Sequence, residues 1–203
     1  TCVTDKGGII GVTGGIASGK TTVLRELAQL GQRTLDSDDV VHELYAPGTR
    51  LYQAVIRRWG DDVLTENQTI DRKAVARRAF ASASEMQWVN RQIHPAVRKH
   101  IAGAAQKGRG PLYCAIPLLF EAGWEDDMLF TVTVWCNQRT RRERCRRRGW
   151  TDAQVNEREK YQIEPDEKLE RADVGIINNA HRALLRLQLQ RLISTVTRGH
   201  KGE

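Results

Sequence analysis

Short apolar runs alternate along the chain with longer segments in which apolar residues recur every three or four positions. Four of the short runs predict strands, at residues 9–12, 112–116, 129–135 and 174–177, and the mixed segment 33–36 between the first two predicts a fifth. Most of the longer segments between them carry a helical period. Strands that alternate with helices indicate an α/β fold with a parallel sheet.

The helical segments differ in length and position. Residues 22–30 predict a first helix with one apolar face, and Gly31 ends it. Residues 49–105 show no strand pattern, so we expect a helical insertion after the second strand. Within this insertion we expect Phe80 to face inward and Pro95 to kink or restart a helix.

Composition narrows the class of protein. A chain of 203 residues with 40% hydrophobic residues can form one compact domain. No apolar run reaches the ~18 residues of a membrane span, and residues 1–8 are too short and polar for a signal peptide. Cys114 and Cys136 lie in apolar runs and form no CxxC pair, which indicates reduced core residues. We therefore expect a cytoplasmic protein without a membrane partner.

The net charge is +7, from 32 basic and 25 acidic residues. An excess of basic residues is typical of proteins that meet polyanions. Much of the excess lies in one segment, which could be a solvated helix, a nucleic-acid patch or a phosphate clamp. Its arginines are Arg139, Arg141, Arg142, Arg144, Arg146, Arg147 and Arg148.

A glycine-rich stretch between the first strand and the first helix carries the main chemical signal. Residues 14–21 fit G-x-x-x-x-G-K-[ST], the phosphate-binding P-loop. Glycines leave backbone N–H groups free to surround phosphate oxygens, and the following helix adds the positive end of its dipole. Lys20 can then reach the β- and γ-phosphates, and the Thr21 hydroxyl can hold Mg²⁺. The stretch predicts binding of ATP and Mg²⁺.

A P-loop does not name the acceptor, and three classes of protein compete. A GTPase would show Asn-Lys-x-Asp after the fourth strand, where residues 136–139 are Cys-Asn-Gln-Arg. A nucleic-acid-dependent ATPase would show a hydrophobic strand that ends in acidic residues, and only Asp36 fits, too early in the chain. A small-molecule or nucleotide kinase remains the favoured class.

A series of motifs then identifies a family. In chain order they are Thr13–Thr22, Leu35–Asp38 with His42, Ile70–Arg72, His94–Pro95, Pro117–Glu121, and Ala172–Asp173 with Asn178–Asn179. This series resembles the dephospho-CoA kinases, and the resemblance covers residues 9 to about 196.

The resemblance implies a P-loop nucleoside-triphosphate hydrolase fold with a five-stranded parallel sheet. The nucleotide-binding core would comprise residues 1–36, 106–136 and 169–203. Residues 37–105 would form a helical substrate domain, and residues 137–168 a mobile helical lid. The implied reaction phosphorylates the ribose 3′-hydroxyl of dephospho-CoA with ATP. We expect a monomer that binds no nucleic acid.

The resemblance also implies roles for single residues. The catalytic set is Asp38 as general base, Lys20, and the lid arginine Arg148. The nucleotide would be bound by Gly15, Ile16, Ala17, Ser18, Gly19, Lys20, Thr21, Thr22, Arg144, Arg148 and Asn178, with Thr21 as the metal ligand. The acceptor would be bound by Asp36, Asp38, His42, Arg72, His94, Pro117, Leu118 and Glu121.

Several of these residues have a structural alternative. Asp38 could cap the helix after the second strand, and Asp36 would then be the next candidate base. His42 could be a surface histidine, and His94 could belong to a helix break. Glu121 could orient substrate or metal, or could cap a turn.

Three positions depart from the usual pattern of the family. Ala17 replaces a glycine in the phosphate loop, which a negative φ would make tolerable. Ala115 replaces an aspartate that could support Mg²⁺ through water. Ala180 and His181 follow Asn179 where the family has Asn-x-Gly, so the adenine contacts are the least secure part of the implied site.

Overall fold

The computed structural model describes residues 8–179 and 181–199. The expectations for the first seven residues and for Ala180 lie outside these ranges. The chain divides into two compact units, one made of Thr1–Asp36 and Ala104–Glu203 and the other of Ser37–Gly103. The sheet belongs to the first unit, and the second unit is helical.

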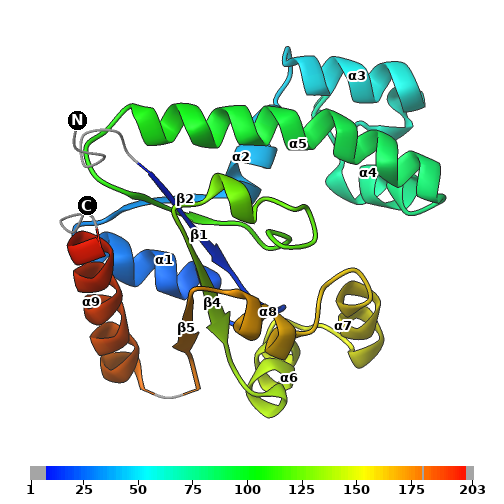
Figure 1. The fold of residues 1–203 in the computed structure, drawn as a ribbon. Coiled ribbons are helices and arrows are strands. Elements are labelled where there is room, and N and C mark those ends of the chain that lie inside the picture. The colour runs from blue at the N-terminus through cyan, green and yellow to red at the C-terminus, as the bar shows by residue number, and fades with distance from the viewer. Residues whose placement is uncertain (1–7, 180, 200–203) are drawn as a thin grey trace. The chain divides into compact units, whose positions relative to one another are not determined.

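The first unit is built on a five-stranded sheet with the order β2-β3-β1-β4-β5 (Figure 1). All pairs are parallel, which confirms the predicted sheet. The strands are β1 (Ile9–Thr13), β2 (Arg33–Asp36), β3 (Leu112–Ala115), β4 (Phe130–Trp135) and β5 (Val174–Ile177). Parallel strands place their carboxyl ends at one edge of the sheet, where open α/β sheets bind ligands.

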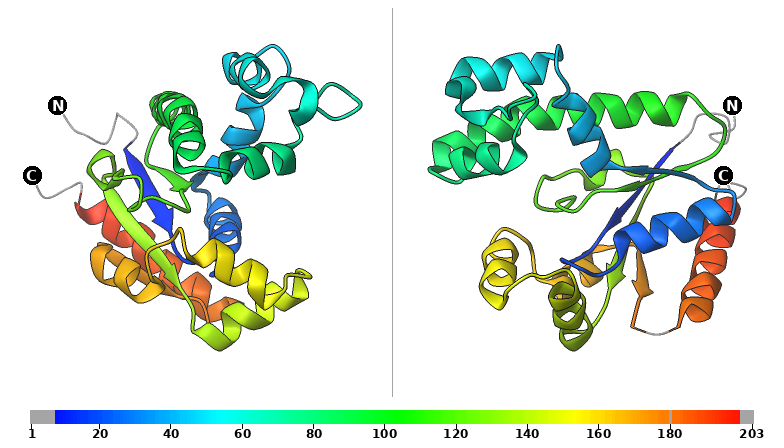
Figure 2. Two further views of the ribbon diagram at one scale, coloured as in Figure 1. Left: turned by 90° about the vertical axis from the view of Figure 1, so that its right-hand side faces the viewer. Right: turned by 180° about the vertical axis from the view of Figure 1, so that it is seen from behind.

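Helices α1 (Lys20–Gln29) and α9 (Arg182–Gly199) lie side by side and pack against this sheet (Figure 2). Their buried leucines share one core with the sheet residues Ile10 and Val132. Helix α1 begins at Lys20, two residues earlier than its apolar period predicts, because the end of the glycine loop already forms its first turn.

Helices α6 (Gln138–Arg147) and α7 (Asp152–Glu159) follow β4. Thr151 and Gln154 form a capping box at the start of α7. A short helix α8 (Pro165–Arg171) then packs against β4. The apolar pattern does not predict α8, because its only fully buried side chain is a lysine, Lys168.

The second unit contains α2 (Ser37–Leu44), α3 (Arg50–Trp59), α4 (Arg72–Ala79) and most of α5 (Ala83–Gln106). Two short 3-10 helices, Gly60–Val63 in this unit and Glu125–Asp127 in the first, complete the elements. Helix α5 runs through Pro95 without ending there. The prediction for Phe80 was wrong: α4 ends at Ala79, so Phe80 leaves the helical face and is 55% exposed.

Two side chains fix β5 at the edge of the sheet. Asp173 accepts hydrogen bonds from N and Oγ1 of Thr131 at 2.7 Å each and donates from its own N to that hydroxyl at 3.0 Å. On α9, Gln188 accepts from the N of Ile177 and donates to its carbonyl oxygen, both at 2.9 Å. The amide of Gln188 thus satisfies both main-chain groups of an edge-strand residue.

Candidate active site

The phosphate loop leaves β1 and enters α1 in a tightly confined conformation. Gly14 has φ 141° and Gly19 has φ 103°, values that only glycine adopts readily. A Cβ at Gly14 would meet the carbonyl oxygen of Val134, and one at Gly19 would meet Nδ2 of Asn178. Glycine is therefore required at both positions, because the loop passes directly against the ends of β4 and β5.

Lys20 folds back over this loop. Its Nζ donates to the carbonyl oxygens of Gly14 at 2.8 Å and Gly15 at 3.1 Å. The N-cap of α1 is Gly19, which makes no side-chain capping hydrogen bond, and Thr21 and Thr22 are exposed. This end of α1 thus combines main-chain donors, a positive dipole end and a lysine, an arrangement suited to phosphate.

We expected alanine to be tolerated at position 17 if its φ were negative, and this condition is not met. Its φ is 54°, in the left-handed region, which costs a residue with a Cβ about 1 kcal/mol or more. Its side chain is buried in a small apolar cluster with Ile16, Cys145 and Val155, against which Trp150 packs. The methyl group that a glycine would lack contributes to this cluster and offsets part of the strain.

Arg144 and Asn178 meet at the same point of the phosphate loop. Arg144 donates to the carbonyl oxygens of Ser18 at 2.9 Å, Ala17 at 3.3 Å and Asn178 at 2.8 Å. Asn178 donates to the same Ser18 oxygen at 2.7 Å. The structure therefore brings together predicted nucleotide-side residues that are more than a hundred positions apart in the chain.

Arg148 follows the last turn of α6 and is exposed. Its guanidinium lies 5.9 Å from the ring centroid of Trp150, and that of Arg158 lies 4.5 Å from the same ring. Arg144 thus contacts the phosphate loop directly, whereas Arg148 lies against the indole of Trp150, just after α6.

The segment after β3 is tied to α8. The carbonyl oxygen of Pro117 accepts from Oγ1 of Thr13 at 3.3 Å and from Nζ of Lys168 at 2.8 Å. Oε1 of Glu121 lies 2.7 Å from the Lys168 ammonium and accepts from the N of Ile163 at 2.8 Å. Burial lowers the pKa of Lys168, and the hydrogen bond that its ammonium donates to Glu121 opposes this shift. Glu121 therefore has a structural role beside the acceptor role implied for it, whereas Leu118 is 40% exposed.

Lys168→Met should lower the free energy of unfolding by about 3 kcal/mol, because it leaves the Glu121 carboxylate without its ammonium partner. Chemical denaturation measures this loss. The double variant Lys168→Met, Glu121→Leu should recover part of it, because no charge then remains unpaired. A single variant as stable as the parent protein would contradict this account.

The remaining predicted residues belong to the second unit, except Asp36, which ends β2. Asp38 is in the first turn of α2, and His42 is one turn further on; both are exposed. Burial, assisted by the positive charge of Arg98, lowers the pKa of His94, which favours its neutral imidazole.

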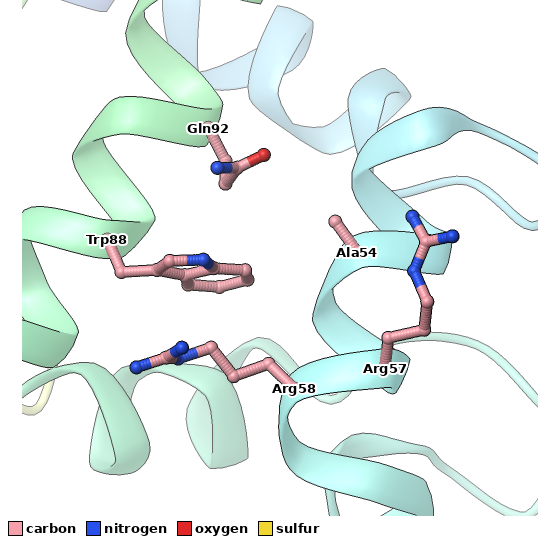
Figure 3. Close-up of a pocket in the computed structure, with 5 residues that line it drawn as sticks. All are labelled: Ala54, Arg57, Arg58, Trp88 and Gln92. Atoms are coloured by element: carbon pink, nitrogen blue, oxygen red, sulfur yellow. The ribbon is translucent and has the colours of Figure 1, made fainter.

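A further part of the second unit was not anticipated from the sequence. A surface cavity of about 290 Å³ between α3 and α5 is lined by Ala54, Arg57, Arg58, Trp88 and Gln92 (Figure 3). The Arg58 guanidinium stacks 4.9 Å from the Trp88 ring centroid and is held by two hydrogen bonds to Glu85, at 2.8 and 2.7 Å. These contacts join the two helices, and none of the predicted site residues lines the cavity.

The residues that the structure describes contain neither a metal-binding cluster nor a membrane-spanning helix. Among residues 8–179 and 181–199, no cluster of three or more His, Cys, Asp or Glu side chains could hold a metal ion. No helix in these ranges is long and apolar enough to cross a bilayer.

The parallel sheet and the loop between β1 and α1 define a P-loop nucleotide-binding protein. Comparison with known proteins gives the family: the dephospho-CoA kinase profile matches residues 8–183. Dephospho-CoA kinases from Gloeobacter violaceus (36% identity; 91% of each chain covered) and Thermosynechococcus vestitus (36%; 95% of this chain, 97% of the relative) are similar throughout. The solved structure of TT1252 from Thermus thermophilus superposes with a TM-score of 0.81 at 28% identity, covering 94% of this chain and 98% of the other. The chain belongs to the dephospho-CoA kinase family.

Proposed function

We propose that this protein transfers the γ-phosphoryl group of ATP to the ribose 3′-hydroxyl of dephospho-CoA, giving CoA and ADP. The observation that carries the proposal is the phosphate loop, in which Lys20 lies over the Gly14 and Gly15 carbonyls at the start of α1. Phosphoryl transfer depends mainly on positioning and on charge stabilisation, and this loop supplies donors and a cation for both.

On the nucleotide side, the main-chain N–H groups from Gly15 to Thr22 would bind the phosphates, with the Lys20 ammonium at the β- and γ-positions. Arg144 and Asn178, joined at Ser18, would lie beside the nucleotide. In the lid, proposed over residues 137–168, the planar guanidinium of Arg148 would stabilise the charge that develops on the transferred group.

Mg²⁺ fits the residues that are present. Magnesium is usually held by one or two protein groups together with substrate phosphates and water, so a cluster of three ligands is not required. The Thr21 hydroxyl is exposed at the start of α1 and would be the protein ligand. Ala115 has no ligand atom in its side chain, so the site would depend more on Thr21. When bound, the ion would neutralise charge on the β- and γ-phosphates.

On the acceptor side, the unit Ser37–Gly103 would supply most contacts to dephospho-CoA. Asp38 would accept the proton of the attacking hydroxyl, because a carboxylate can act as a general base at neutral pH. The other acceptor contacts would be Asp36, His42, Arg72, His94, Pro117, Leu118 and Glu121. Consistent with this reaction, we propose a cytoplasmic monomer.

A panel of acceptors tests the proposal. The purified protein, with ATP and Mg²⁺, is offered dephospho-CoA, AMP, UMP, shikimate or RNA, and ADP and phosphorylated product are measured. We expect phosphate transfer to dephospho-CoA alone. Transfer to a different acceptor only, or ATP hydrolysis stimulated by RNA only, would overturn the proposed function.

Arg148→Lys tests the proposed lid role of Arg148. Lysine retains the charge but loses the planar fork, so we expect kcat to fall about tenfold or more while the KM for dephospho-CoA changes less. Steady-state kinetics with the matched variant Arg147→Lys, an exposed neighbour on the same helix, gives the control. An unchanged kcat together with weaker binding of polyanions would instead support a solvated basic patch.

A further inference from the structure

One face of α6 is turned toward the phosphate loop. Arg144 hydrogen-bonds to the Ala17 and Ser18 carbonyls, and Cys145 packs in the apolar cluster that contains Ala17. Residues three or four positions apart share a helix face. Arg141 precedes Arg144 by three positions and Cys145 by four, so the same face carries a further arginine one turn closer to the start of α6.

Arg141 is held directly against the loop. Its side chain is only 11% exposed, and a methyl group placed on Gly15 would lie 3.4 Å from its Nη1. The same methyl group would lie 3.0 Å from Cγ of Pro165, so Gly15 is enclosed by Arg141 and the start of α8. Three positive charges converge at the end of β4: burial raises the pKa of Cys136, and Arg144, Arg141 and Lys20 each oppose this shift.

The hydrogen-bonding capacity of this buried guanidinium is only partly used. Nη1 of Arg141 lies 3.0 Å from Oε1 of Glu159, but Nε is buried and has no hydrogen-bond partner in the part of the chain that the structure describes. A buried donor without a partner costs free energy that a suitable ligand can recover. A guanidinium matches two oxygens of a phosphate group at once, which would use donors that Glu159 leaves unpaired.

Glu159 can release Arg141 without becoming isolated. Its carboxylate also pairs with Arg142, through Oε2 and Nη2 at 3.4 Å. Arg142 in turn donates to Asn156 at 2.9 Å and pairs with Asp152 at 3.4 Å. Phosphate oxygens could therefore replace the Glu159 carboxylate as the partner of Arg141. While Glu159 stays paired with Arg141, its negative charge would repel an anion bound at the loop.

We infer that Arg141 is a third cationic ligand for the phosphates of the nucleoside triphosphate, beside Lys20 and Arg144, and that it exchanges Glu159 for phosphate oxygens when the nucleotide binds. The inference rests on the proposed function for the identity of its ligand. It assigns two opposed roles: Arg141 favours triphosphate binding, and Glu159 competes with it.

Nucleotide titrations without acceptor test this inference. In calorimetric titrations with Mg²⁺, Arg141→Gln should weaken ATP and tripolyphosphate binding about tenfold, the scale of one charged hydrogen bond, and should leave adenosine binding unchanged. The control is Arg139→Gln, whose side chain is 89% exposed, and which should bind ATP as the parent protein does. Parent-like affinity of Arg141→Gln for ATP and tripolyphosphate would overturn the inference.

Glu159→Gln supplies a test that does not remove the buried arginine. This variant lacks the competing charge, so ATP should bind several times more tightly than to the parent protein, and weaker binding would overturn the inference. This measurement decides the matter if thermal melting shows that Arg141→Gln does not fold. Because no acceptor is present, the measured ATP affinity does not depend on whether the protein phosphorylates dephospho-CoA. Failure of the parent protein to phosphorylate dephospho-CoA would overturn only the proposed function.

Discussion

Lys20→Ala should lower the rate of phosphoryl transfer to dephospho-CoA by about 100-fold or more, the scale on which one lost charge contact to the transition state acts. The ammonium of Lys20 lies 2.8 and 3.1 Å from the Gly14 and Gly15 carbonyls, directly over the loop that would hold the phosphates. Among the described residues, no other lysine donates a hydrogen bond to this loop. Initial rates at saturating ATP and dephospho-CoA measure the effect.

The control for Lys20→Ala is Lys107→Ala, an exposed lysine of the same unit, which should retain the parent rate. ATP binding is titrated in parallel. The Lys20 ammonium also holds the loop in shape through its hydrogen bonds to Gly14 and Gly15, so its loss can loosen the phosphate site. Near-normal turnover of Lys20→Ala would show that the loop is not used for phosphoryl transfer, and the proposed function would then lack its main support.

Asp38→Asn should transfer phosphate at least about 100-fold more slowly, the usual scale for losing a general base. A ribose hydroxyl is a poor nucleophile in neutral water, so a positioned carboxylate should matter. Asparagine keeps the shape of aspartate and its ability to cap a helix, so the first turn of α2 should survive the change. Thermal melting should therefore be unchanged, and the variant should still bind ATP.

Asp39→Asn is the matched control for Asp38→Asn, because both residues are exposed acids in the first turn of α2. It should turn over at the parent rate. If Asp38→Asn folds, binds ATP and is as fast as the parent protein, then Asp38 is only a cap. The base would have to be sought elsewhere, first at Asp36 at the end of β2.

The sheet could be predicted because its signals are local. Four of the five strands contain short apolar runs, and the glycine loop fixes the transition from β1 to α1 within eight residues, Gly14–Thr21. Helix α8 shows the limit of this reasoning: its buried side chain is Lys168, whose burial depends on Glu121 and the Pro117 carbonyl, groups outside the helix. A hydrophobic period cannot reveal a charge that is buried because of a distant partner.

The candidate site, like the sheet, was predictable only where its residues are neighbours in the sequence. The loop residues form a contiguous motif, but the contact between Arg144 and Ser18 joins positions 126 residues apart, and only the folded chain shows it. The backbone of Ala17 was not predictable either, since its left-handed φ is compensated by packing against residues of α6 and α7 such as Cys145 and Val155. Arg141 could have been found, because its spacing from Arg144 and Arg148 places it on their helix face, but nothing local separates it from the exposed arginines beside it.

The amide of Gln188 has a consequence for how copies of this protein behave in a crowded solution. An uncovered edge strand is a template on which a second molecule can extend the sheet, and repeated extension leads to aggregates. At Ile177 of β5 both main-chain groups are already satisfied by this one side chain. The sheet is thus closed to a neighbouring chain at that point without a further strand, proline or charge, although the Ile177 side chain itself is 40% exposed.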